Sequence, residues 1–144
     1  MPSATTSDFL YQKQMDYLLK NTPVFTPPSS LWVALFTSTP SLNGTGGVEV
    51  SLVGTNYSRV QIQASNGWQG PSGANLEYSN LLELVFGVPS ANWGTIVGAG
   101  LYDAAEAGNL YYVSYLTTSK TVSNGDGAPK ILAGQMRVTR STCP

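Results

Sequence analysis

From residue 31 onward, short apolar segments alternate with clusters of Gly, Asn, Pro and Ser that interrupt any long element. Residues 31–37 and 110–116 have the length and the aromatic and β-branched content of strands, and Asn-Gly and Asp-Gly at 124–127 are strong turn signals. Six or seven such segments predict a mainly β domain spanning residues 31–144. We expect an antiparallel β-sandwich or a partly closed barrel.

The pattern within each segment predicts which faces are buried. Residues 31–37 are apolar throughout, as expected for a strand buried on both faces. Residues 57–64 alternate, which places Val60 and Ile62 inside and Arg59 on a solvated face. Leu82, Leu84, Phe86 and Val88 are expected to share one face of a further strand. Within 95–103, the glycines predict a bend or a close approach of backbones.

Residues 1–30 form a separate expected unit, a helix followed by a proline-rich arm at 21–30. Ser7 is a suitable N-cap, and Thr22-Pro23 ends the helix. Helical spacing places four apolar residues on one face as a stripe, namely Tyr11, Met15, Leu18 and Leu19. A short helix is marginal alone, so this stripe must pack on something. It packs either on the chain's own β domain or on a neighbouring subunit, which makes it the candidate subunit interface.

The composition excludes several function classes. Charged residues make up 10% of the chain and the net charge is -1, so no basic face is available for nucleic acid. Histidine is absent, which removes Ser-His-Asp catalysis and His-containing zinc sites. The acidic residues are scattered. We therefore expect no enzyme activity, no catalytic residues, no metal and no cofactor.

Export and membrane insertion are also not expected. The longest apolar run, residues 31–36, is far too short to span a bilayer. Residues 1–8 lack the basic start of a signal peptide, so export by the general secretory route is not expected. The single cysteine, Cys143, cannot form an intrachain disulfide.

Trp68 is the candidate exposed contact or receptor residue, because it stands alone in a loop rich in Gly and Asn. An exposed Trp can stack on a sugar ring or anchor a partner subunit. The alternative is that Trp68 folds back over the edge of the core.

Four segments, in order, are similar to a family of small bacteriophage virion proteins described as tail fibre or tail proteins. They are LWVALFTSTP at 31–40, YSRV at 57–60, ANWGTIV with LYDA at 91–104, and GNL, LTTSKTV and GD within 108–126. The resemblance covers most of the chain, although Asn92 and the stretch at 126–132 depart from the family pattern. It implies no catalytic residues.

The resemblance implies a structural virion component that is tail-associated, as a tail fibre, tail tip or neck protein. Its partners would be copies of itself and other virion proteins, assembled as a homo-oligomer by protein–protein contacts. A capsid decoration or cement protein is the first alternative. A glycan or receptor-binding module that uses Trp68 on the host surface is the second.

Overall fold

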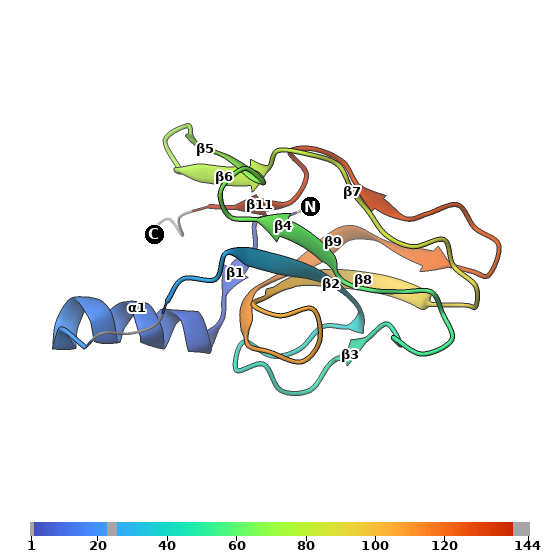
Figure 1. The fold of residues 1–144 in the computed structure, drawn as a ribbon, viewed down its shortest axis with the longest axis horizontal. Helices are drawn as coiled ribbons and strands as arrows, with labels where there is room; N and C mark the ends of the chain where they lie inside the picture. Colours follow the sequence, from blue (N-terminus) through green and yellow to red (C-terminus); the bar gives the residue numbers. More distant parts are fainter. Residues whose placement is uncertain (1, 23–25, 140–144) are drawn as a thin grey trace.

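The computed structural model describes residues 2–22 and 26–139, in which one helix accompanies short strands (Figure 1). The elements in chain order are β1 (Thr5–Thr6), α1 (Asp8–Lys20), β2 (Ser30–Ser38), β3 (Val48–Glu49), β4 (Val60–Gln63), β5 (Trp68–Ser72), β6 (Glu77–Asn80), β7 (Leu84–Val85), β8 (Gly94–Tyr102), β9 (Leu110–Val122), β10 (Lys130–Ile131) and β11 (Arg137–Val138). The expected mainly β fold with an N-terminal helix is confirmed.

The strands form two layers. The main sheet has the order β1-β9-β8-β2, and both β3 and β4 pair with the outer edge of β2. The second layer contains the pair β7-β10 and the sheet β5-β6-β11, and every strand pairing is antiparallel. Side chains from both layers meet in one apolar core. The layers are an open sandwich rather than a closed barrel.

Strand β2 is buried on both faces, as its uninterrupted apolar sequence predicts. Val33 and Leu35 point into the core between the layers. Ala34 and Phe36 point the other way, into a smaller cluster beneath the sheet. Gly100 of β8 makes this packing possible, because a Cβ there would lie 2.8 Å from the Phe36 ring. A Cβ at Gly98 would lie 2.8 Å from the Ser114 carbonyl oxygen, so the predicted close approach of backbones is confirmed at that glycine.

The helix also begins after the expected N-cap and ends before Thr22, while Pro23 lies outside the described residues. The Ser7 hydroxyl accepts a hydrogen bond from the Leu10 amide, and Asn21 closes the helix in a left-handed conformation. Just before the helix, β1 pairs with β9, joining Thr5 to Val113 and Thr6 to Tyr112. A two-residue strand carries no periodic pattern, so the sequence does not predict this strand pairing with the β domain.

The predicted strand face from Leu82 to Val88 is wrong at both ends. Only Leu84–Val85 is a strand, and of the four side chains Leu84 and Phe86 are buried while Leu82 and Val88 are exposed. The backbone bends at residues 81–82 as the chain leaves the β5-β6-β11 sheet. This bend turns Leu82 away from the face that its spacing indicates.

Candidate functional site

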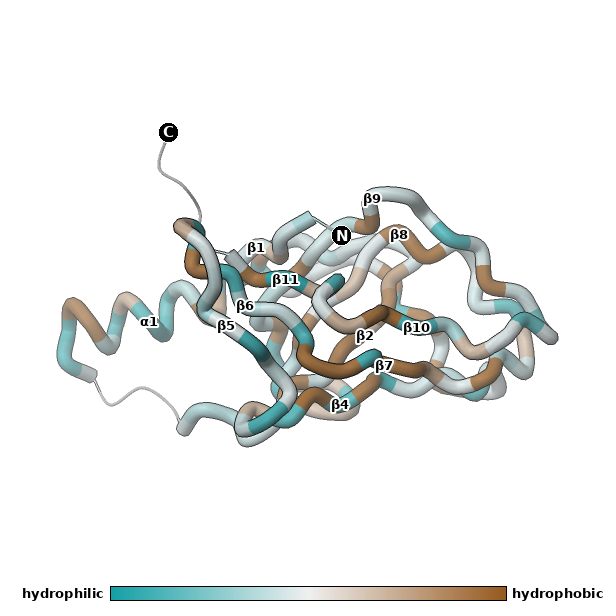
Figure 2. Tube along the Cα trace, turned by 90° about the horizontal axis from the view of Figure 1, so that it is seen from above, coloured by the Kyte–Doolittle hydropathy of each residue, from teal (hydrophilic) through white to brown (hydrophobic). Residues whose placement is uncertain are grey.

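Helix α1 is fixed to the β domain at its first turn and projects from it. The Ser7 hydroxyl, fully buried, donates to the Leu110 carbonyl, and the Asp8 amide donates to the Leu42 carbonyl. The Phe9 ring lies 5.6 Å from the Tyr111 ring, between centroids. Beyond this anchor the helix runs away from the strands in both Figures 1 and 2.

The candidate stripe lies on the projecting part of the helix. Tyr11, Leu18 and Leu19 are 59%, 68% and 78% exposed, and Met15 is half-buried. Figure 2 shows a hydrophobic stretch in the outer part of α1, away from every strand. Within the described residues, the stripe is thus an apolar surface directed mainly to solvent. Whether another subunit covers it stays a prediction.

Trp68 begins β5 and is half-buried against the core. This placement is the one expected if the indole folds over the core edge. It still lines an open hollow of about 180 Å³, which we call the aromatic hollow, formed by Leu31, Trp68, Tyr78, Leu101, Tyr112 and Val138. The structure does not bring Trp68 together with the helical stripe of the same chain, and its role as a contact residue stays a prediction.

Arg59 is buried, so its predicted place on a solvated face is wrong. Its guanidinium binds the Glu49 carboxylate through two hydrogen bonds, Nε to Oε1 at 2.9 Å and Nη2 to Oε2 at 2.8 Å. The Tyr57 hydroxyl donates to Glu49 Oε1 at 3.0 Å and accepts from the Leu35 amide at 2.8 Å. Each buried polar group therefore has a partner, which is the condition for burying a charge.

The same guanidinium joins segments that are distant in the sequence. Arg59 Nη1 donates to the carbonyls of Ala104 and Ala107, and the guanidinium stacks on the Tyr102 ring at 3.9 Å. The Asp103 carboxylate in turn accepts hydrogen bonds from the backbone N–H and the side-chain Nδ2 of Asn109. The YSRV, LYDA and GNL segments thus meet in one hydrogen-bonded cluster, which joins them in the fold.

A family model described as podophage GP4 fiber I protein gp80 matches residues 5–139. The chain belongs to this family. The match covers most of the chain and confirms the resemblance to phage tail fibre proteins. A search of curated proteins gave no match. The chain is therefore a phage fibre structural protein and a component of the virion.

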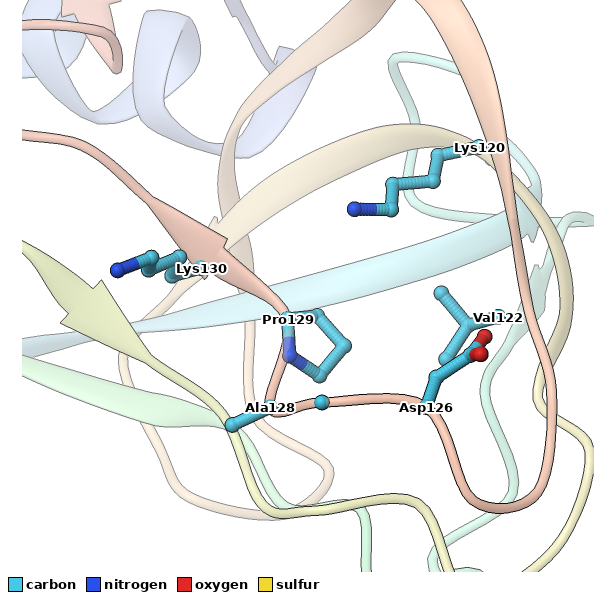
Figure 3. A pocket seen from close by; sticks show the side chains of 7 residues that line it. Lys120, Val122, Asp126, Ala128, Pro129 and Lys130 are labelled. Atoms are coloured by element: carbon cyan, nitrogen blue, oxygen red, sulfur yellow. The ribbon is translucent and has the colours of Figure 1, made fainter.

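A hollow on this fiber I family member lies where β9 approaches the loop before β10. It measures about 370 Å³, and Figure 3 shows Lys120 and Lys130 on opposite sides of it. The Asp126 carboxylate accepts a hydrogen bond from the Ser123 backbone N–H at 2.7 Å, which closes the turn. Lys130 pairs with Glu83 at 3.3 Å on the surface. The Asp126 carboxylate therefore stabilises a turn, and the Glu83 carboxylate forms a surface ion pair.

Within residues 2–22 and 26–139, no group of three or more His, Cys, Asp and Glu residues is placed to hold a metal ion. No helix in this part of the fiber I family chain has the length and apolarity to cross a membrane.

Alkaline pH is expected to destabilise this fiber I family protein. Burial, and next the Glu49 carboxylate, raises the pKa of the Tyr57 hydroxyl above its ordinary value of 10. The unfolded chain loses this proton near pH 10 while the folded chain keeps it, so the stabilisation is complete below pH 10 and is lost above it. We expect the free energy of unfolding to fall by about 1.4 kcal/mol per pH unit for this group.

Urea denaturation between pH 9 and 11.5 measures this dependence. The Tyr57→Phe variant is the control, because it removes the titrating group and retains the ring that stacks on Phe86. The variant should show a shallower decline than the unmodified chain. An equal decline in both proteins would contradict the assignment to Tyr57.

Proposed function

We propose that this fibre protein is a non-enzymatic, tail-associated component that assembles through the exposed stripe on α1. The observation that carries the proposal is the projection of the helix, which leaves Tyr11, Leu18 and Leu19 largely in solvent. Synthesis in the host cytoplasm, followed by incorporation into the particle, fits this proposal. Its partners are other virion proteins, including copies of itself.

The helix has more apolar surface than its own domain covers. Isolated helices of this length are marginal in water, and most helix stability in proteins comes from packing an apolar face. The first turn is fixed to the β domain through the Ser7 hydrogen bond to the Leu110 carbonyl and the buried Leu10 side chain. Burial of the stripe stabilises an assembly by roughly 25 cal/mol per Å² of apolar surface. A docking role therefore explains why the stripe is present.

The variant Leu18→Glu/Leu19→Glu tests this proposal. A phage lacking the gene is complemented in trans with the variant, and incorporation is measured by quantitative blotting of purified particles. We expect at least a tenfold loss of incorporation, because an assembled interface would bury two unpaired carboxylates. The free energy of unfolding should change by less than about 0.5 kcal/mol, since both positions are exposed in the free protein.

Val53→Glu is the matched control, because Val53 is exposed and lies on a loop away from the helix. This variant should incorporate like the unmodified chain. Incorporation of the helix variant at the unmodified level would overturn the proposed role of the stripe.

The two alternative functions receive less support. The matched family is described as a fibre protein, and this favours the tail over a capsid decoration role. The polar side-chain groups of the aromatic hollow are two tyrosine hydroxyls and the indole N–H of Trp68, and no charged or amide side chain lines it. Ligand sites fix orientation with a few precisely placed polar groups, and without a carboxylate or amide here we do not propose glycan binding.

A further inference from the structure

We infer that the open side of the sandwich, formed by residues 115–122 of β9 and by β10, receives an extended acidic segment of another virion protein, which pairs as a strand with the outer edge of β9. The end of β9 and the β7-β10 pair lie at the end of the molecule opposite α1 (Figure 1). The inference therefore concerns a second contact surface and does not depend on the role of the stripe.

The two layers are joined along one half of β9 and not along the other. At the joined half, β1 pairs with β9, and Ala4, just before β1, forms a bridge with Val138 of β11. Along residues 115–122, no described strand pairs with the outer edge of β9, and the partner of β10 within the described chain is β7 alone. Both layers thus end in a free strand edge at the open side.

A free strand edge selects an extended backbone as its occupant. It presents N–H and C=O groups at the spacing of a strand, and an added strand satisfies them. Residues 120–122 are held in place for this pairing, because they pair with residues 94–96 of β8 on their other side. This ladder of three residues is longer than the two-residue ladder that holds β1. The residues before it bulge out of the β8 pairing and are exposed at 117–119, where they can contact the continuation of the added strand.

An apolar slot of about 90 Å³ opens between the layers on this side. Its apolar lining comes from both layers and includes Leu35, Phe86, Ile96, Leu116, Val122 and Ile131. The slot shares Lys120, Val122 and Lys130 with the hollow in Figure 3, so the two are continuous. Successive side chains of a strand point to opposite faces, so an added strand directs a side chain toward the slot. The lining favours a small aliphatic one.

Lys120 determines the charge that the incoming segment needs. Its side chain lines both the slot and the hollow, on the same face of β9 as the buried Val122. Lys130 and Asp126 are engaged in the surface pair and the turn described above, whereas Lys120 forms no ion pair with any described residue. An inward-pointing lysine on an edge strand opposes pairing with an uncharged strand, because its ammonium would be buried unpaired. A segment with a carboxylate beside its apolar residue removes this penalty, so Lys120 selects an acidic segment.

Hydrogen exchange followed by mass spectrometry tests the strand pairing, with the purified full chain compared with purified particles. We expect outward-facing amides within residues 115–122 to exchange at least tenfold more slowly in the particle, because the added strand accepts their hydrogen bonds. A small anion bound at Lys120, or a contact through side chains alone, would leave this exchange unchanged. Unchanged exchange would therefore overturn the inference.

Charge variants test the role of Lys120. We expect Lys120→Glu to reduce incorporation into particles at least tenfold, measured by quantitative blotting after complementation in trans. Lys120→Arg is the matched control, because it keeps the positive charge at the same position, and it should incorporate like the unmodified chain. Lys120 is exposed in the free protein, so both variants should retain the urea midpoint of the unmodified chain. Normal incorporation of Lys120→Glu, or an equal loss from both variants, would count against an acidic partner and overturn the inference.

Crosslinking within particles identifies the partner. Thr118 is exposed in β9, so Thr118→Cys, combined with Cys143→Ser, can carry a thiol-linked photo-crosslinker beside the proposed strand. We expect the crosslinked peptide to come from a different virion protein and to contain an aspartate or glutamate next to an apolar residue. A crosslink to a second copy of this chain, or to a segment without a carboxylate, would overturn the inference.

Discussion

Replacing Glu49 with Gln is expected to lower the free energy of unfolding by about 3–5 kcal/mol. The side chain of Arg59 is only 4% exposed, and Glu49 is the carboxylate that neutralises it. Removing the negative charge leaves a buried guanidinium held by two carbonyls and a tyrosine ring. The expected loss of stability is the one seen when a single partner of a buried ion pair is removed. Removing one partner costs much more than removing both, because the remaining charge stays buried without a counter-ion.

Urea denaturation measures this effect, with Glu83→Gln as the matched control. Glu83 also pairs with a cation, Lys130, but both side chains are well exposed. Exposed pairs contribute about 0–1 kcal/mol, so the control should be close to wild type. Equal losses from Glu49→Gln and Glu83→Gln would contradict the structural role of the buried cluster.

Trp93→Ala is expected to cost about 3–5 kcal/mol, because the indole fills the centre of the core. Trp93 is 5% exposed and makes an edge contact with Tyr57, at 5.2 Å between ring centroids. Its Nε1 donates to the Thr55 carbonyl at 2.9 Å. The substitution thus creates a cavity and leaves a buried carbonyl without this donor.

Thermal denaturation followed by circular dichroism measures the effect, and Trp68→Ala is the comparison. Each kcal/mol corresponds to roughly 2–4 °C in Tm for a chain of about this size. Trp68 is half-buried, so its truncation should lower Tm by less than half as much. A larger loss from Trp68→Ala than from Trp93→Ala would contradict the assignment of Trp93 to the central core.

Much of the fold could be predicted where the determining signals are local. Ser7 with the apolar spacing that follows it predicts α1, and the unbroken apolar run at 31–37 predicts β2. Turn residues between short segments predict the antiparallel sandwich. Each of these signals acts over a few residues, so neighbouring sequence is sufficient to read it.

Features that depend on distant residues could not be predicted in this way. Alternation places Arg59 opposite Ile62 and therefore in solvent, but it does not reveal that Glu49 arrives from another strand to neutralise the charge. The strand β1 exists because β9 offers it a partner, and two residues carry no pattern. Leu82 has strand spacing, but the backbone bend before it overrides that spacing.

For the candidate site, too, the local features could be predicted from the sequence and the features that join distant residues could not. Helical periodicity predicts the stripe, since Tyr11, Met15, Leu18 and Leu19 are close in sequence and share one face. The aromatic hollow joins residues from position 31 to position 138, on six strands. No local pattern connects Trp68 with Tyr112 or Val138, so only the packing of the two layers reveals that they share a surface.

Immunogold labelling of purified particles tests the central claim most directly. Antibody against this chain, viewed by electron microscopy, reports where on the virion the protein lies. The proposed tail-associated fibre role predicts gold at the tail, with little on the head. Gold spread evenly over the head would contradict a tail-associated role, and the absence of label together with a negative blot of denatured particles would contradict a virion role altogether.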